Sequence, residues 1–157
     1  MAHAANPEAV KAAIRLGAHS VEHGYIMDEE CIQLFLEHDV WYVPTLAISH
    51  LTPGQASNVW EQRWVEQRHL ASDLCHRADT AVDEHRAWFQ RALAAGVKMA
   101  LGSDIRPLKE AALLEMGLWV KDGPRRGRPC WRQQNMPQRC VALVQTSAPS
   151  RWGSWRI

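Results

Sequence analysis

The feature that most constrains this chain is a regular alternation of short apolar runs with helical patterns, which continues to about Gly123. Four runs have the length and composition of strands: residues 1–3, 19–23, 41–46 and 97–103. Helical spacing covers the segments that follow them: residues 7–16, 28–36, 57–95 (one bent helix or two) and 108–120. This order is typical of parallel β/α units, because a helix returns the chain to the start of the next parallel strand.

The number of these units favours one α/β architecture over another. Four β/α units in about 123 residues are half of the eight that close a (β/α)₈ barrel. An open doubly wound sheet is the competing fold, but it carries a glycine-rich phosphate-binding turn after a strand, and this sequence has none. The sequence therefore predicts half of a barrel over residues 1–123.

Composition indicates a globular protein. The 157 residues are 46% hydrophobic and 22% charged, and no window approaches the eighteen apolar residues of a membrane span. The first residues carry no signal-peptide pattern, so we expect a cytoplasmic protein without a membrane partner. Four cysteines occur without a C-x-x-C pair, and we expect free thiols: Cys31, Cys75, Cys130 and Cys140.

Three polar residues stand where predicted strands end. His3 closes the first strand, His23 the second and Asp104 the fourth. In an α/β barrel the active site lies at the carboxyl ends of the strands, and two imidazoles with a carboxylate there could bind zinc or a similar divalent ion. The alternative from spacing alone is a pair of structural histidines and an Asp104 that caps a helix.

The segments around these residues resemble a known family. Four of them are similar, in order, to strands five to eight of the amidohydrolase superfamily, in its imidazolonepropionase-like and prolidase-like branch: Ala2-His3-Ala4, Ser20-Val-Glu-His23-Gly24, Trp41-Tyr-Val-Pro-Thr-Leu46 and Ala95-Gly-Val-Lys-Met-Ala-Leu-Gly-Ser-Asp104. The resemblance implies the C-terminal half of a TIM-like (β/α)₈ barrel of a metal-dependent hydrolase.

The resemblance also implies roles for individual residues. His3 and His23 match the family's histidines that bind one metal, and Asp104 matches the aspartate that binds metal and serves as catalytic base. The family hydrolyses C–N bonds of small amides, cyclic amides or peptides through metal-bound hydroxide, with one or two divalent ions, typically Zn²⁺. Tyr25 follows His23 on a loop at the rim, where we expect it to contact substrate.

Other ligands of the family lie outside this match. Its first-strand His-x-His pair and fourth-strand lysine would precede Met1, so we expect this chain to be a fragment that is inactive alone. The alternative is a non-catalytic binding or assembly module that pairs with itself or with a complementary half. Exposed strand edges and an apolar interior favour such pairing, including a homo-oligomer.

Residues 124–157 have a different composition. They contain seven of the 18 basic residues and none of the 17 acidic ones. A basic tail that binds nucleic acid would fit, but translation in the wrong frame fits better. Permitted codons up to Ile157, shifted by one base, give ALLAATKYAAEMRGAGADLGTVEVGKLAD, which has the Gly-Lys-x-Ala-Asp ending of the family. We therefore expect this Arg/Trp/Pro-rich tail to be out of frame and disordered, and we expect no nucleic-acid partner.

Overall fold

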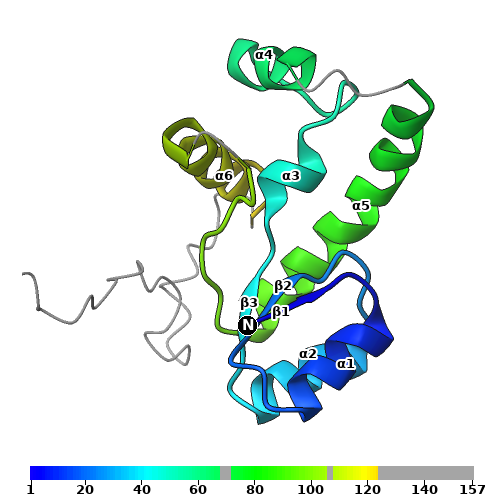
Figure 1. Ribbon diagram of the computed structural model, residues 1–157, viewed down its shortest axis with the longest axis vertical. Helices are drawn as coiled ribbons and strands as arrows, with labels where there is room; N and C mark the ends of the chain where they lie inside the picture. The colour runs from blue at the N-terminus through cyan, green and yellow to red at the C-terminus, as the bar shows by residue number, and fades with distance from the viewer. Residues whose placement is uncertain (68–71, 106–107, 124–157) are drawn as a thin grey trace, which may run out of the picture.

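The computed structural model describes residues 1–67, 72–105 and 108–123, and these residues form an α/β fold on a small parallel sheet (Figure 1). The elements follow in this order: β1 (Ala2–Ala4), α1 (Pro7–Arg15), β2 (Ser20–His23), α2 (Glu29–Glu37), β3 (Trp41–Val43), α3 (Leu46–His50), α4 (Val59–Gln67), α5 (Ser72–Ala95) and α6 (Leu108–Asp122). The predicted alternation of strands and helices is confirmed for the described part of the chain.

The sheet has the order β1-β2-β3, and both pairings are parallel. Ala4 pairs with His23, and Val21 pairs with Tyr42. A fourth segment joins β3 through a parallel bridge between Tyr42 and Met99, within the run predicted as a strand. Consecutive parallel strands in sequential order are what repeated β/α units produce.

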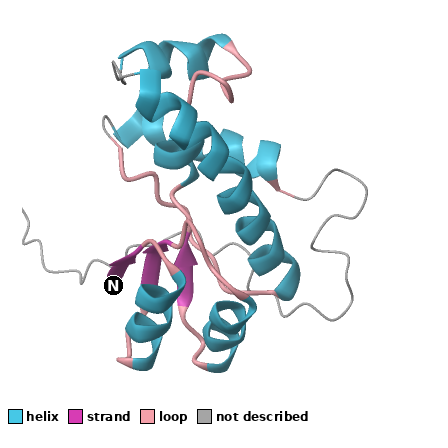
Figure 2. Ribbon diagram, turned by 90° about the vertical axis from the view of Figure 1, so that its right-hand side faces the viewer, coloured by secondary structure: helices cyan, strands magenta, loops and turns pink. Residues whose placement is uncertain are grey.

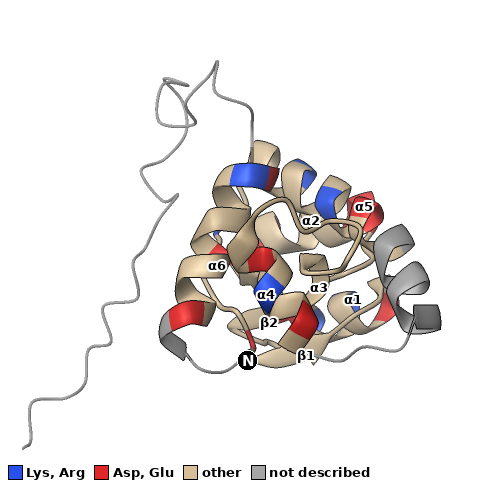
Figure 3. Ribbon diagram, turned by 90° about the horizontal axis from the view of Figure 1, so that it is seen from above, with Lys and Arg blue, Asp and Glu red and all other residues tan. Residues whose placement is uncertain are grey.

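Side-chain caps fix where the first two helices begin. Asn6 Oδ1 accepts a hydrogen bond from Ala9 N at 3.0 Å, and Asp28 Oδ1 accepts one from Cys31 N at 2.9 Å. These caps satisfy amide groups that have no partner inside a helix. The two helices lie side by side against the sheet (Figure 2). Ion pairs join their solvent side, as between Lys11 and Asp28, and Figure 3 shows basic and acidic segments mixed over the helices.

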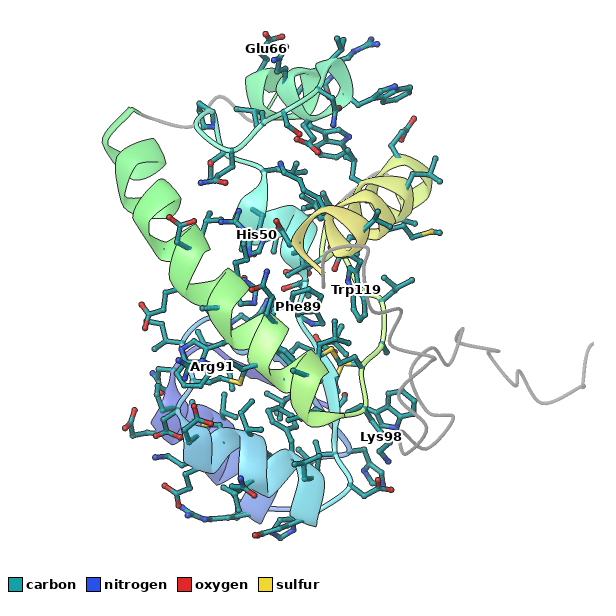
Figure 4. All side chains as sticks on the ribbon, turned by 180° about the vertical axis from the view of Figure 1, so that it is seen from behind. His50, Glu66, Phe89, Arg91, Lys98 and Trp119 are labelled. Atoms are coloured by element: carbon teal, nitrogen blue, oxygen red, sulfur yellow. The ribbon has the colours of Figure 1, made fainter. Side chains whose placement is uncertain are left out.

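The core lies between the sheet and these helices. Val21 and Tyr42, neighbours on one face of the sheet, are fully buried, and the Tyr42 ring contacts Phe35 of α2 with centroids 5.5 Å apart. A second part of the core joins α5 to α6, where Phe89 and Trp119 make an edge contact at 5.2 Å (Figure 4). Cys31 is a buried free thiol, as predicted.

Several boundaries differ from the sequence prediction. The strand expected over residues 41–46 ends at Val43, and the short helix α3 follows, because Pro44 and a left-handed Thr45 break the extended conformation. The long helical pattern is two helices, α4 and α5. On α4, Trp60 is 63% exposed.

Two further predictions concern the C-terminal tail and a membrane span. The tail that we expect to be out of frame and disordered, residues 124–157, lies outside the described residues. Among the described helices, none is both long and apolar enough to span a membrane.

Candidate functional site

The side chains of His3 and His23 meet at the carboxyl edge of the sheet. Their imidazole rings lie in an edge contact, with centroids 4.1 Å apart and planes inclined by 64°. The register alone does not explain this contact, because His3 pairs with Glu22. Paired residues of neighbouring strands point to the same face and successive residues to opposite faces, so regular geometry would place the two rings on opposite sides of the sheet.

The backbone of His23 resolves this conflict. His23 has φ of 75°, in the left-handed region, which interrupts the strand alternation and allows its ring to reach His3. Two more left-handed non-glycine residues follow sheet segments: Thr45, with φ of 53°, follows β3, and Asp104, with φ of 51°, follows the segment bridged to β3 at Met99. A further one, Asp39 with φ of 56°, precedes β3. Such conformations are uncommon, cost free energy, and cluster at functional sites. Left-handed residues thus occur where β2, β3 and the segment bridged to β3 end.

Hydrogen bonds orient the ring of His23. Within the described residues, Thr45 Oγ1 and Tyr25 Oη both lie 2.9 Å from His23 Nδ1. When Nδ1 carries the proton and donates to one of these oxygens, Nε2 keeps its lone pair for a metal ion. Burial, followed by the nearby His3, lowers the pKa of His23, which favours the neutral ring that a metal requires.

Asp104 stands at the same edge with an exposed carboxylate. Its negative charge acts on His23, where it partly opposes the fall in pKa. No group of three His, Cys, Asp or Glu side chains within the described ranges is arranged around a common ion position. The donor types of His3, His23 and Asp104 suit a divalent ion, yet they form only part of a coordination shell. Their assignment as ligands stays a prediction.

Tyr25 takes a position that spacing did not indicate. Its hydroxyl bonds to His23, and its ring contacts both His23 and His85, each with centroids 5.1 Å apart. The predicted contact of Tyr25 with substrate stays a prediction. What the geometry adds is a link between the edge of the sheet and helix α5.

A second set of polar side chains lies beneath this edge, and we call it the buried network: Tyr42, His50, His85 and Asp122. His50 Nδ1 lies 2.6 Å from Asp122 Oδ2, and the two ring nitrogens of His85 lie 3.1 Å from His50 Nε2 and from the Tyr42 hydroxyl. His50 is the last residue of α3 (Figure 4), and its ring contacts His85 of α5 and Asp122 of α6. His85 of α5 is only 1% exposed, so its ring is buried between α5, α3 and β3.

Electrostatics in the buried network follow from its burial. Burial and the neighbouring His50 lower the pKa of His85 to about 3. Burial also lowers the pKa of His50, although the Asp122 carboxylate opposes this. For Asp122, burial acts to raise the pKa, but the hydrogen bond from His50 and the charge of Arg86 outweigh it and lower the pKa. No short motif marks these residues, because they come from four separate elements.

Known proteins are similar to this chain over most of its described part. The model of the amidohydrolase family matches residues 1–128. Ochratoxinase from Aspergillus niger is 30% identical over 113 residues, which are 71% of this chain and 21% of that protein. The chain therefore spans about a fifth of the length of this curated relative.

Solved structures give the same result for the fold. A Xaa-Pro dipeptidase with bound methionine in its active site superimposes with a TM-score of 0.59 and 27% identity, covering 78% of this chain and 29% of that one. The A. niger ochratoxinase structure superimposes with a TM-score of 0.58 and 26% identity, covering 76% and 25%.

Proposed function

This chain belongs to the amidohydrolase family, and from that premise we propose that it supplies the C-terminal half of the (β/α)₈ barrel of a metal-dependent hydrolase. The bonds cleaved are amide or peptide C–N bonds. The observation that carries this proposal is the contact of His3 with His23 at a strand edge where His23, Thr45 and Asp104 are all left-handed. The active sites of such barrels occupy this edge.

Each residue has a role that its geometry supports. His3 and His23 would hold a divalent ion, His23 through Nε2, because its Nδ1 is held by Thr45 and Tyr25. When bound, such an ion polarises the scissile carbonyl and acidifies water. The exposed carboxylate of Asp104 takes a proton from the attacking water and returns it to the leaving nitrogen. Tyr25 is within reach of a substrate that enters over His23.

The remaining ligands would come from outside this sequence. The relatives are about three times as long as this chain, since 71% of it matches 21% of ochratoxinase by sequence and 78% of it covers 29% of the dipeptidase by structure. The names of these relatives suggest two substrate classes, Xaa-Pro dipeptides and ochratoxin, both of which contain an amide bond to an amino acid. We propose substrates of that general kind.

Zinc binding tests the ligand assignment directly. In competition with a chromophoric chelator, the chain should bind Zn²⁺ weakly, and His23→Ala should lower the affinity at least tenfold, or about 1.4 kcal/mol. His38→Ala is the matched control, because His38 is exposed at the opposite ends of the strands and should leave the affinity unchanged. Equal affinities for both variants would exclude His23 as a ligand.

Activity tests whether the chain is sufficient. With Zn²⁺, Mn²⁺ or Co²⁺ added, the purified chain should hydrolyse neither a panel of Xaa-Pro dipeptides nor ochratoxin at an appreciable rate, because two histidines and one carboxylate leave the ion incompletely enclosed. Typical enzymes turn over at about 10 s⁻¹. A rate within about tenfold of that value, lost in Asp104→Asn, would show that this chain is a complete catalyst.

The rival function, a non-catalytic assembly module, has one observation in its favour. Strand β1 lies at the edge of the described sheet, with β2 on its other side. An edge strand offers backbone groups to a further strand, from another copy or from a complementary half barrel. Pairing with the complementary half would also complete the hydrolase, so the two functions are compatible.

A further inference from the structure

The buried network ends on the backbone of His23. Starting from Asp122, polar contacts of 2.6 to 3.1 Å run through His50 and His85 to the hydroxyl of Tyr42. That hydroxyl lies 3.0 Å from the carbonyl oxygen of His23 and 3.3 Å from that of Gly24. The network therefore connects α6, α3, α5 and β3 to the point where β2 ends.

Tyr42 also contacts the residue after His23 through its ring. Gly24 has φ of 54°, and a Cβ atom built there would lie 2.8 Å from Tyr42 Cε2. The ring thus fills the space beside Gly24, while the hydroxyl holds the two carbonyl groups. Two consecutive left-handed residues, His23 and Gly24, are in contact with one fully buried side chain. Burial and several hydrogen bonds can maintain a backbone conformation that is unfavourable on its own.

The single hydroxyl proton of Tyr42 determines which of its neighbours donate hydrogen bonds and which accept them. A tyrosine hydroxyl has one proton, so it can donate to the His23 carbonyl only if it does not donate to His85. Tyr42 must then accept from His85, which requires a proton on Nε2 of that ring. His85 Nδ1 becomes an acceptor, and Ser49 Oγ at 3.0 Å can donate to it. The neutral His50 ring donates through Nδ1 to Asp122, so its Nε2 has no proton to donate to His85 Nδ1, and these two nitrogens are in contact without a hydrogen bond.

We propose that Tyr42 and His85 are positioning residues for His23: through the carbonyl groups of His23 and Gly24 they hold the left-handed backbone that turns the His23 imidazole towards His3. The inference rests on the proposed function, because positioning matters only if His23 is a ligand. It predicts that residues with no contact to metal or substrate control the geometry of this ligand.

Four variants of the full chain test the proposal by nuclear magnetic resonance without metal. Wild type should show a nuclear Overhauser contact between the His3 and His23 rings, which are 4.1 Å apart. Tyr42→Phe and His85→Leu should lose it. His85→Gln should retain it, because the glutamine amide can still donate to Tyr42. Ser57→Ala is the control: it removes a part-buried hydrogen bond, to Glu61 at the start of α4, that involves neither the buried network nor the residues around His23.

Zinc affinity of the same variants separates this inference from the proposed function. Tyr42→Phe should bind Zn²⁺ about tenfold more weakly than wild type, within the range seen when a partner of a metal ligand is removed. If wild type shows the contact between the His3 and His23 rings but does not bind zinc, the proposed function is overturned and the positioning role is still supported. The positioning role would be overturned if the contact between the His3 and His23 rings persists in Tyr42→Phe, or if it is lost in Ser57→Ala as well.

The tautomer of His85 provides a test in the unmodified chain, should Tyr42→Phe fail to fold. Nitrogen-15 shifts distinguish a protonated Nε2 from a protonated Nδ1. A proton on Nε2 is the expected result. A proton on Nδ1 alone would mean that Tyr42 donates to His85 instead of the His23 carbonyl, and the proposal would be wrong.

Discussion

Between pH 7 and pH 4.5, His85 alone should lower the free energy of unfolding by about 2–3 kcal/mol. Its pKa is about 3 in the folded chain against an ordinary value of 6.5, because it is buried beside His50. Below pH 6.5 the unfolded chain takes up a proton that the folded chain does not bind. Stability therefore falls as the pH drops from 6.5 towards 3, by about 1.4 kcal/mol per pH unit, and this group contributes no further change above 6.5.

Other groups titrate over the same range, so the variant His85→Gln isolates the effect. His23 and His50 have lowered pKa values and act in the same direction as His85. Burial raises the pKa of Glu115 to about 7, so this group acts in the opposite direction between pH 7 and 4.5. Urea unfolding of wild type and His85→Gln at both pH values measures the difference. Equal pH dependence in the two proteins would mean that His85 is already protonated in the folded state or exposed to solvent.

The sequence predicted the fold where local signals were strong. Asn6 and Asp28 are side-chain caps that can be recognised from residue type and position, and both helices begin where these caps indicate. Alternating apolar runs likewise predicted parallel strands. These signals are local, because a cap or a strand is determined by residues that are close in the chain.

Elements held by distant residues were not predicted. Helix α3 has five residues, too few for helical propensity to matter, and its first amide groups bond to Glu115 about seventy residues later. The buried network was missed for the same reason, as Tyr42, His85 and Asp122 meet only in the folded chain. At the candidate site, the resemblance indicated His3, His23 and Asp104, but not Thr45 or the left-handed backbone that brings the histidine rings together.

Glu115→Ala should destabilise the chain by about 3–5 kcal/mol, because Glu115 replaces the missing cap of helix α3. Thr45, which precedes this helix, makes no side-chain cap bond. Instead, the Glu115 carboxylate accepts hydrogen bonds from Leu46 N at 3.0 Å and Ala47 N at 2.6 Å, and from Trp119 Nε1 at 2.9 Å. Glu115 is 1% exposed, so alanine would leave two buried amide groups without partners, each at a cost of about 1–3 kcal/mol, and would add a cavity.

The same substitution should reach the candidate site, because α3 follows Thr45 directly and carries His50. Urea unfolding should be compared with Glu84→Ala, a change on the exposed surface of α5 that should cost less than about 0.5 kcal/mol. Glu115→Gln should lie between the two, since its amide keeps one acceptor oxygen for the start of α3. In Glu115→Ala we also expect the contact between the His3 and His23 rings to weaken, because Thr45 would no longer be fixed against His23 Nδ1. A loss in the free energy of unfolding below about 1 kcal/mol, with an intact contact between the His3 and His23 rings, would contradict this role. It would mean that water or another side chain bonds to the first amide groups of α3, and that Glu115 is not its cap.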